Sequence, residues 1–106
     1  MSKFKVTYSS AASLDLENIV SYIIEHFKDI NAAKSISHEI KTKIRSLNEM
    51  PERYALVDWE PWLSMNIHKF PVKNYVVFYQ VDNKAKEVTV IRIFYSGRDI
   101  ENVIKG

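Results

Sequence analysis

The sequence predicts an α+β domain in which an antiparallel pair of helices covers one face of a mostly antiparallel sheet. Apolar residues recur at helical spacing between about residues 12 and 50, and β-branched and aromatic residues fill two runs between residues 74 and 96. A length of 106 residues fits one core, so we expect residues 1–106 to form a single domain. The expected order is one strand, two helices, three strands and a short tail.

The N-terminal segment predicts a strand followed by a helix. Residues 3–8 alternate polar and apolar side chains with period two, as in a half-buried strand. Ser9 and Ser10 follow and are suited to cap a helix, which we expect from about residue 12 to residue 27. Asp15 lies in its first turns, where a carboxylate suits the helix dipole.

The next segment predicts a second helix. Asp29 or Asn31 can cap it, and Met50 before Pro51 should end it, because a residue preceding proline is disfavoured in the helical conformation. A connection this short makes the two helices antiparallel neighbours. We interpret the lysines of this helix as a solvated face. They include Lys34, Lys41 and Lys43.

Residues 51–64 predict an irregular connection, because prolines and mixed polarity interrupt any periodic pattern. Trp59 and Trp62 flank a proline there and could form a recognition surface. We favour the alternative that they cap one end of the core. Residues 65–72 then predict the second strand.

Two apolar runs around the polar turn at residues 83–86 predict a hairpin. Both runs are apolar at nearly every position, so we expect each strand to be covered on two sides or to lie inside the sheet. Arg92 lies within the second run, and a buried arginine without a partner costs several kcal/mol. It therefore needs an ionic partner, access to water or a function. Gly97 should end the strand, with a short helical tail after it.

Composition excludes several classes of protein. The chain has no cysteine, and its three histidines lack a ligand spacing, so we expect no metal and no other cofactor. No apolar run approaches the roughly 20 residues of a membrane helix, and no signal peptide is present, so we expect a cytoplasmic protein without a membrane partner. A formal net charge of +2 is too weak by itself to indicate nucleic-acid binding.

Candidate functional residues gather on the predicted strands, although no nucleotide-binding loop or nucleophile motif is present. Basic side chains could bind phosphates, and a histidine or tyrosine could act as an acid or base. The alternatives are solvated edge charges at Lys69 and Lys73, a structural carboxylate paired with Arg92, and an ion pair between Arg98 and Asp99. The candidates are His68, Lys69, Lys73, Tyr75, Arg92, Tyr95 and Arg98.

The element order and several segments resemble the RelE/ParE superfamily of bacterial toxins from type II toxin–antitoxin systems. The resemblance covers essentially the whole chain. The residues that carry it in the helical part are Tyr8 and Ser9 with Ala12, Asp15 and Leu16, then Ile44, Leu47, Met50 and Pro51. The later segments are Glu60–Trp62, Val72–Tyr79 and Val90–Ile100.

The resemblance implies two possible mechanisms. RelE-like members cleave mRNA in the ribosomal A site without a metal, with the 2′-hydroxyl of the RNA as nucleophile. ParE-like members lack the catalytic residues and poison DNA gyrase. Because His68 could serve as a base, we favour a ribosome-dependent endoribonuclease, with a gyrase inhibitor or an inactive antitoxin-binding protein as alternatives. In that interpretation His68, Tyr95 and Arg98 are catalytic, and Lys69, Lys73 and Arg92 bind RNA.

The resemblance also implies a cognate antitoxin as partner. In this superfamily an extended, partly helical antitoxin segment usually surrounds the helix pair and an edge of the sheet. We expect this antitoxin to be acidic, since the predicted functional face is basic. Ribosome and mRNA, or DNA gyrase in the alternative, are the other expected partners.

Overall fold

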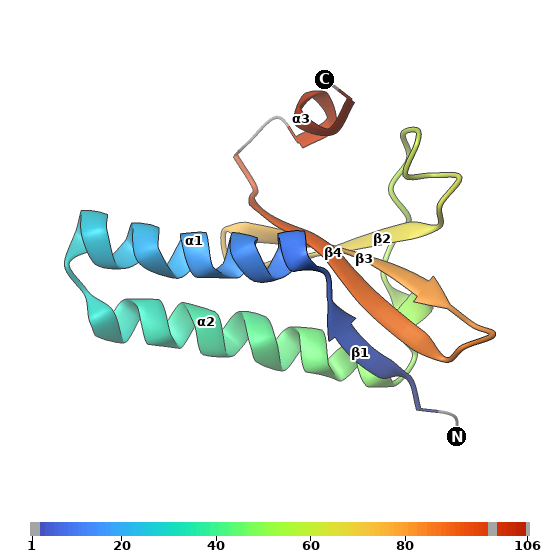
Figure 1. Cartoon of the computed structure of the whole chain (residues 1–106), viewed down its shortest axis with the longest axis horizontal. Coiled ribbons are helices and arrows are strands. Elements are labelled where there is room, and N and C mark those ends of the chain that lie inside the picture. Colours follow the sequence, from blue (N-terminus) through green and yellow to red (C-terminus); the bar gives the residue numbers. More distant parts are fainter. Residues whose placement is uncertain (1–2, 98–99, 106) are drawn as a thin grey trace.

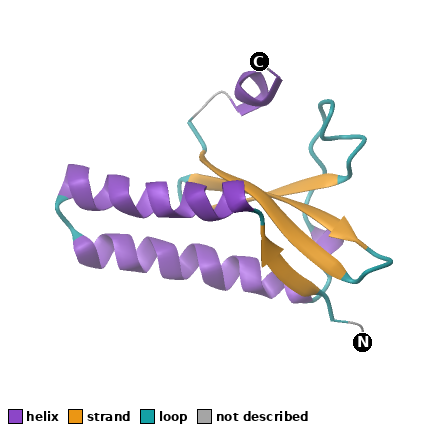
Figure 2. Ribbon diagram, viewed as in Figure 1, coloured by secondary structure: helices purple, strands orange, loops and turns teal. Residues whose placement is uncertain are grey.

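The computed structural model describes residues 3–97 and 100–105, and it has the predicted α+β architecture. Two long helices lie side by side and extend beyond one end of a twisted sheet (Figure 1). A short third helix follows the last strand, on the other side of α1 from α2 (Figure 2). Among the described residues, no helix is both long and apolar enough to cross a membrane. The elements are β1 (Lys5–Tyr8), α1 (Ser10–Phe27), α2 (Ile30–Arg45), β2 (Ile67–Val72), β3 (Tyr75–Asp82), β4 (Glu87–Tyr95) and α3 (Ile100–Lys105).

Side-chain caps start both long helices where the sequence predicts them. The Ser9 hydroxyl accepts a hydrogen bond from the Ala12 amide at 3.0 Å, and the Asp29 carboxylate accepts one from the Ala32 amide at 2.9 Å. Each bond satisfies an amide that has no partner inside the helix. Lys28, in the left-handed conformation, ends α1 and begins the tight connection to α2.

The second helix ends earlier than predicted. It stops at Arg45, and a turn of 3-10 helix at residues 46–48 replaces its expected last turn. The tighter turn coincides with full burial of Leu47. Arg53 then donates to the backbone carbonyls of Glu49 and Met50, at 2.7 and 3.1 Å, and Pro51 begins a second turn of 3-10 helix, Pro51–Arg53.

The sheet has the strand order β1-β4-β3-β2. The β2–β3 and β3–β4 pairs are antiparallel, as expected, and β1 pairs with β4 in parallel. The two long apolar strands, β3 and β4, are therefore the inner strands. A β-bulge interrupts their pairing between Phe78 and Tyr79, opposite Ile91.

The two faces of the sheet carry separate apolar clusters. We call the side covered by α1 and α2 the helix face and the opposite side the second face. Trp62 is buried in the cluster of the second face, and Trp59 stacks on it, so these rings cover the core as favoured from the sequence. The hydrophobic sheet residues buried on the helix face are Phe70, Val72, Val77, Tyr79, Val88, Val90 and Ile93. Those buried on the second face are Ile67, Phe78 and Phe94.

The two edges of the sheet differ in how far they are closed. At the β2 edge, the Val57 amide donates to the Ile67 carbonyl at 2.8 Å, and the Lys69 amide donates to the Ala55 carbonyl at 3.0 Å. At the β1 edge, the Phe4 amide donates to the Asn48 carbonyl at 2.8 Å. The loop at residues 55–57 therefore closes the β2 edge along its first half, whereas the bond at the β1 edge is made by Phe4, the residue before β1.

Candidate functional site

His68 lies on the helix face and is 5% exposed. Its Nδ1 atom is 2.8 Å from the Tyr54 carbonyl oxygen, and its ring stacks on Tyr79 with the centroids 5.2 Å apart. Lys69 is the next residue of β2 and points to the second face, because side chains alternate along a strand. The predicted base and the predicted RNA-binding lysine thus lie on opposite sides of the sheet.

Arg92 has the ionic partner that its apolar surroundings require. Its Nε and Nη2 atoms donate to the two carboxylate oxygens of Asp15, at 2.8 and 3.0 Å. The Asp15 carboxylate also accepts the Ile93 amide at 2.9 Å, so one carboxylate joins α1 to β4. The bonds to Asp15 raise the pKa of Arg92, against the opposing effect of burial. Its guanidinium carbon lies 4.4 Å from the centroid of the Phe94 ring.

Lys69 is exposed beside a small cleft on the second face. The cleft walls include Trp59, Phe78 and Ile100, so its surface is mainly apolar with one ammonium group at the rim. Lys73 lies in the turn between β2 and β3, and its Nζ atom is 3.7 Å from the Glu39 carboxylate on α2. Lys73 is therefore part of an exposed ion pair, which agrees with the edge-charge alternative.

Tyr95 is 57% exposed at the end of β4, and its ring meets that of Tyr75 edge to face at 6.1 Å. Burial raises the pKa of Tyr75, and the neighbouring Tyr22 and Tyr95 contribute in the same direction. Tyr75 pairs with Tyr95 across the strands, and Tyr79 pairs with His68. Four residues of β3 span about 13 Å, which separates His68 from Tyr95. Arg98 lies outside the described residues.

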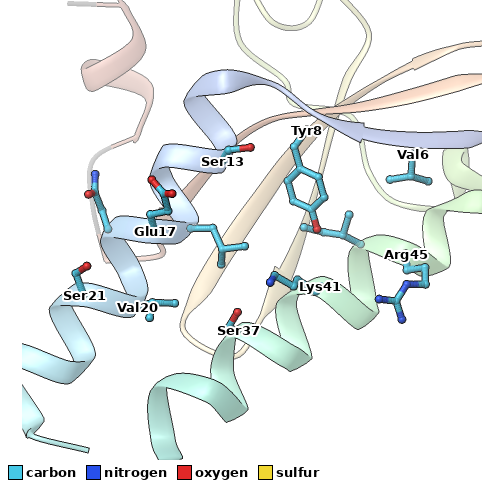
Figure 3. A pocket seen from close by; sticks show the side chains of 12 residues that line it. Val6, Tyr8, Ser13, Glu17, Val20, Ser21, Ser37, Lys41 and Arg45 are labelled. Carbon is cyan, nitrogen blue, oxygen red and sulfur yellow. The ribbon is translucent and has the colours of Figure 1, made fainter. Parts of the chain in front are cut away.

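A second candidate site is an open groove between α1, α2 and β1, with a volume of about 950 Å³ (Figure 3). Tyr8 points from the end of β1 into the space between the helices. Lys41 and Arg45 line the α2 side, and Glu17 lines the α1 side. Burial raises the pKa of the Tyr8 hydroxyl, while the nearby Arg45 charge acts in the opposite direction.

This groove was missed by sequence reasoning, which assigned Lys41 to a solvated face. Lys41 and Arg45 are four residues apart, so they lie on one side of the helix. They adjoin the buried Ile40 and Ile44. The sequence signal for this groove was the position of two cations, Lys41 and Arg45, beside the apolar stripe of the helix. The packing of the two helices beside β1 was needed to show that these cations line a groove.

Comparison with known proteins identifies the family. Residues 6–100 match the model of the ParE toxin of type II toxin–antitoxin systems, parDE. The chain belongs to the ParE toxin family. This match spans β1 to the start of α3 and thus includes both candidate sites.

Solved structures show the same fold at low sequence identity. The chromosomal ParDE toxin–antitoxin system from P. aeruginosa has a chain with TM-score 0.71 and 16% identity, over 88% of this chain and 96% of that one. A mutant of the E. coli toxin RelE in the free state has a TM-score of 0.66 and 18% sequence identity, over 99% of this chain and 93% of that one. The RelBE2 toxin–antitoxin complex from M. tuberculosis has a chain with a TM-score of 0.61 and 17% sequence identity, over 90% of this chain and 93% of that one. No curated protein matches the sequence.

Proposed function

We propose that this ParE-family toxin arrests growth by binding DNA gyrase and does not cut RNA. The placement of His68 carries this proposal. A general base must reach the proton that it removes, whereas His68 is buried on the helix face, with Nδ1 at the Tyr54 carbonyl. On the second face, Arg92 is held by Asp15, and Lys69 is an exposed cation beside a mainly apolar cleft.

The match to the ParE toxin model supports the same choice. The superfamily resemblance implies gyrase as the target of ParE-like members. The endoribonuclease favoured from the sequence is the competing function. It would require Tyr95 or Arg98 to assemble with Lys69 when RNA binds, without a contribution from His68.

We further propose that a cognate antitoxin neutralises the chain. The ParDE and RelBE2 relatives are toxin–antitoxin systems, which supports such a partner. The groove between α1 and α2, together with the adjoining β1 edge, offers apolar and charged surface at the place where the superfamily resemblance puts the antitoxin.

Induction of the chain in cells that lack the antitoxin tests the choice of mechanism. We expect growth arrest with gyrase-linked DNA breaks and altered plasmid supercoiling, while mRNA ends in translated frames stay as in uninduced cells. A His68→Gln variant that still folds should arrest growth as well, since the ring is assigned a structural contact. New mRNA ends that vanish when translation is blocked would instead establish the endoribonuclease.

A further inference from the structure

The cleft on the second face of the sheet has the chemistry of a docking site for a protein segment. We propose that it binds a surface segment of gyrase, which inserts an apolar side chain against Trp59 and Phe78 and places a carboxylate beside Lys69. This inference rests on the proposed function, and it specifies which surface of the chain meets gyrase and which side chains of gyrase fit that surface.

The walls of the cleft are apolar and are held in place by the fold. The cleft has a volume of about 460 Å³, and its lining includes Trp59, Val76, Phe78 and Ile100. The Trp59 ring stacks on Trp62 with the centroids 5.0 Å apart, so its position is set before a partner binds. Preformed apolar pockets with an aromatic wall hold the few side chains that contribute most of the binding energy at protein interfaces.

The charges on this face favour a single carboxylate. Lys69, Phe78 and Arg92 form one row across β2, β3 and β4, because Phe78 pairs with both of the other residues. Asp15 neutralises Arg92, whereas Lys69 forms no ion pair with any residue that the structure describes. An ammonium group at the rim of an apolar cleft attracts one opposite charge and thereby orients the segment that binds.

The same row of residues is poorly suited to a nucleic acid. Each nucleotide carries a phosphate, so an RNA strand that crosses the second face would need several free cations. This row offers Lys69 alone, since the charge of Arg92 is already balanced by Asp15. A protein segment with one acidic residue close to an apolar residue matches the surface better.

The edge of β2 beside the cleft is closed to an added strand. The Ile67 carbonyl and the Lys69 amide already bond to the loop at residues 55–57. Backbone groups alternate along a strand, so Pro71 is the next residue to face outward, and a proline has no amide hydrogen to donate. The segment of gyrase therefore has to bind through its side chains, and the contact depends on Lys69 and on the apolar walls.

Binding of the purified full-length chain to purified gyrase tests the charge requirement. We expect Lys69→Glu to bind at least about tenfold more weakly than the wild type, and Lys69→Arg to stay within about threefold, since it keeps the charge. Lys84→Glu is the matched control, because Lys84 is exposed in the turn between β3 and β4 and does not line the cleft. Its affinity should change less than about twofold, and a loss equal to that of Lys69→Glu would overturn the carboxylate contact.

A second pair of variants tests the insertion of an apolar side chain. Ala55→Phe fills the cleft with a ring of the chain itself, and Ala85→Phe adds the same ring in the turn between β3 and β4. Both alanines are exposed, and circular dichroism checks that both variants fold. We expect Ala55→Phe to lose at least about tenfold in affinity for gyrase and Ala85→Phe to bind like the wild type. Equal affinities of the two variants would overturn insertion into the cleft.

The outcomes separate this inference from the proposed function. Binding to gyrase that persists in both Lys69→Glu and Ala55→Phe contradicts the cleft as the docking site and leaves the gyrase proposal intact. A wild-type chain that does not bind gyrase contradicts both. Binding of single-stranded RNA to the wild type that is lost in Lys69→Glu would assign the cleft to RNA and overturn the inference.

Discussion

The helix face and the second face of the sheet are covered by very different structures. Two long helices close the helix face, which also holds the ring of His68 and the hydroxyl of Tyr79. The second face is covered by the loop around Trp59 and Trp62 and by a helix of six residues. Among the described residues, every buried side-chain nitrogen and oxygen has a partner.

This difference indicates that the two faces of the sheet have different roles. His68 and Lys69 are neighbours in β2, yet one is fixed inside a packed layer and the other is exposed beside a cleft. Polar side chains on the helix face stabilise the fold. On the second face, Lys69 is exposed beside the cleft, whereas Arg92 is held by Asp15.

Truncation of one apolar residue on each face gives the largest expected contrast in stability. Ile44→Ala removes a side chain that is 1% exposed beneath the sheet and should lower the free energy of unfolding by about 2–5 kcal/mol. Val76→Ala removes a half-buried side chain on the second face and should lower it by about 1 kcal/mol. Denaturant unfolding measures both values. Similar losses from the two variants would show that the faces contribute equally.

Removal of Asp15 should have the next largest effect, because this carboxylate links α1 to the Arg92 side chain of the second face. Asp15→Ala leaves the Arg92 guanidinium and the Ile93 amide without their partner and should cost about 2–3 kcal/mol. The matched control is Glu39→Ala, which removes the exposed pair with Lys73 and should cost less than about 1 kcal/mol. Equal losses of unfolding free energy in the two variants would mean that water replaces the Asp15 carboxylate as the partner of Arg92.

Local sequence signals predicted the elements well. The caps at Ser9 and Asp29 form because a serine or aspartate side chain satisfies helix amides within its own segment. The apolar runs of β3 and β4 predicted inner strands, since only strands covered on both faces can be apolar throughout.

The candidate site was less predictable, because it depends on contacts between distant segments. In β2, Phe70 and Val72 point to one face and Ile67 to the other, so hydrophobicity did not indicate which face the helices cover or where His68 points. Asp15 was interpreted as a helix-dipole residue, although its carboxylate binds a strand 77 residues later in the sequence. Neither contact has a signal in the sequence near the residue concerned.

A smaller effect is expected from removal of the Tyr79 hydroxyl, which donates to the Pro51 carbonyl inside the helix face. Tyr79→Phe should cost about 1 kcal/mol at neutral pH, the net value of one hydrogen bond. Tyr95→Phe, at an exposed ring, should change stability by less than about 0.5 kcal/mol.

The same hydroxyl should also make stability depend on alkaline pH. Burial raises the pKa of Tyr79 far above its ordinary value, with the Arg53 charge opposing this effect. Above about pH 10 the unfolded chain ionises this tyrosine while the folded chain keeps it protonated, so stability should fall as pH rises. Tyr79→Phe should make the fall of the unfolding free energy with pH less steep, by the equivalent of up to one proton between pH 10 and 11. The contributions of Tyr8 and Tyr75 would remain, because burial also raises the pKa values of these tyrosines. Denaturant unfolding at several pH values measures the slope, and parallel curves for variant and wild type would show that water reaches Tyr79 through the helix layer.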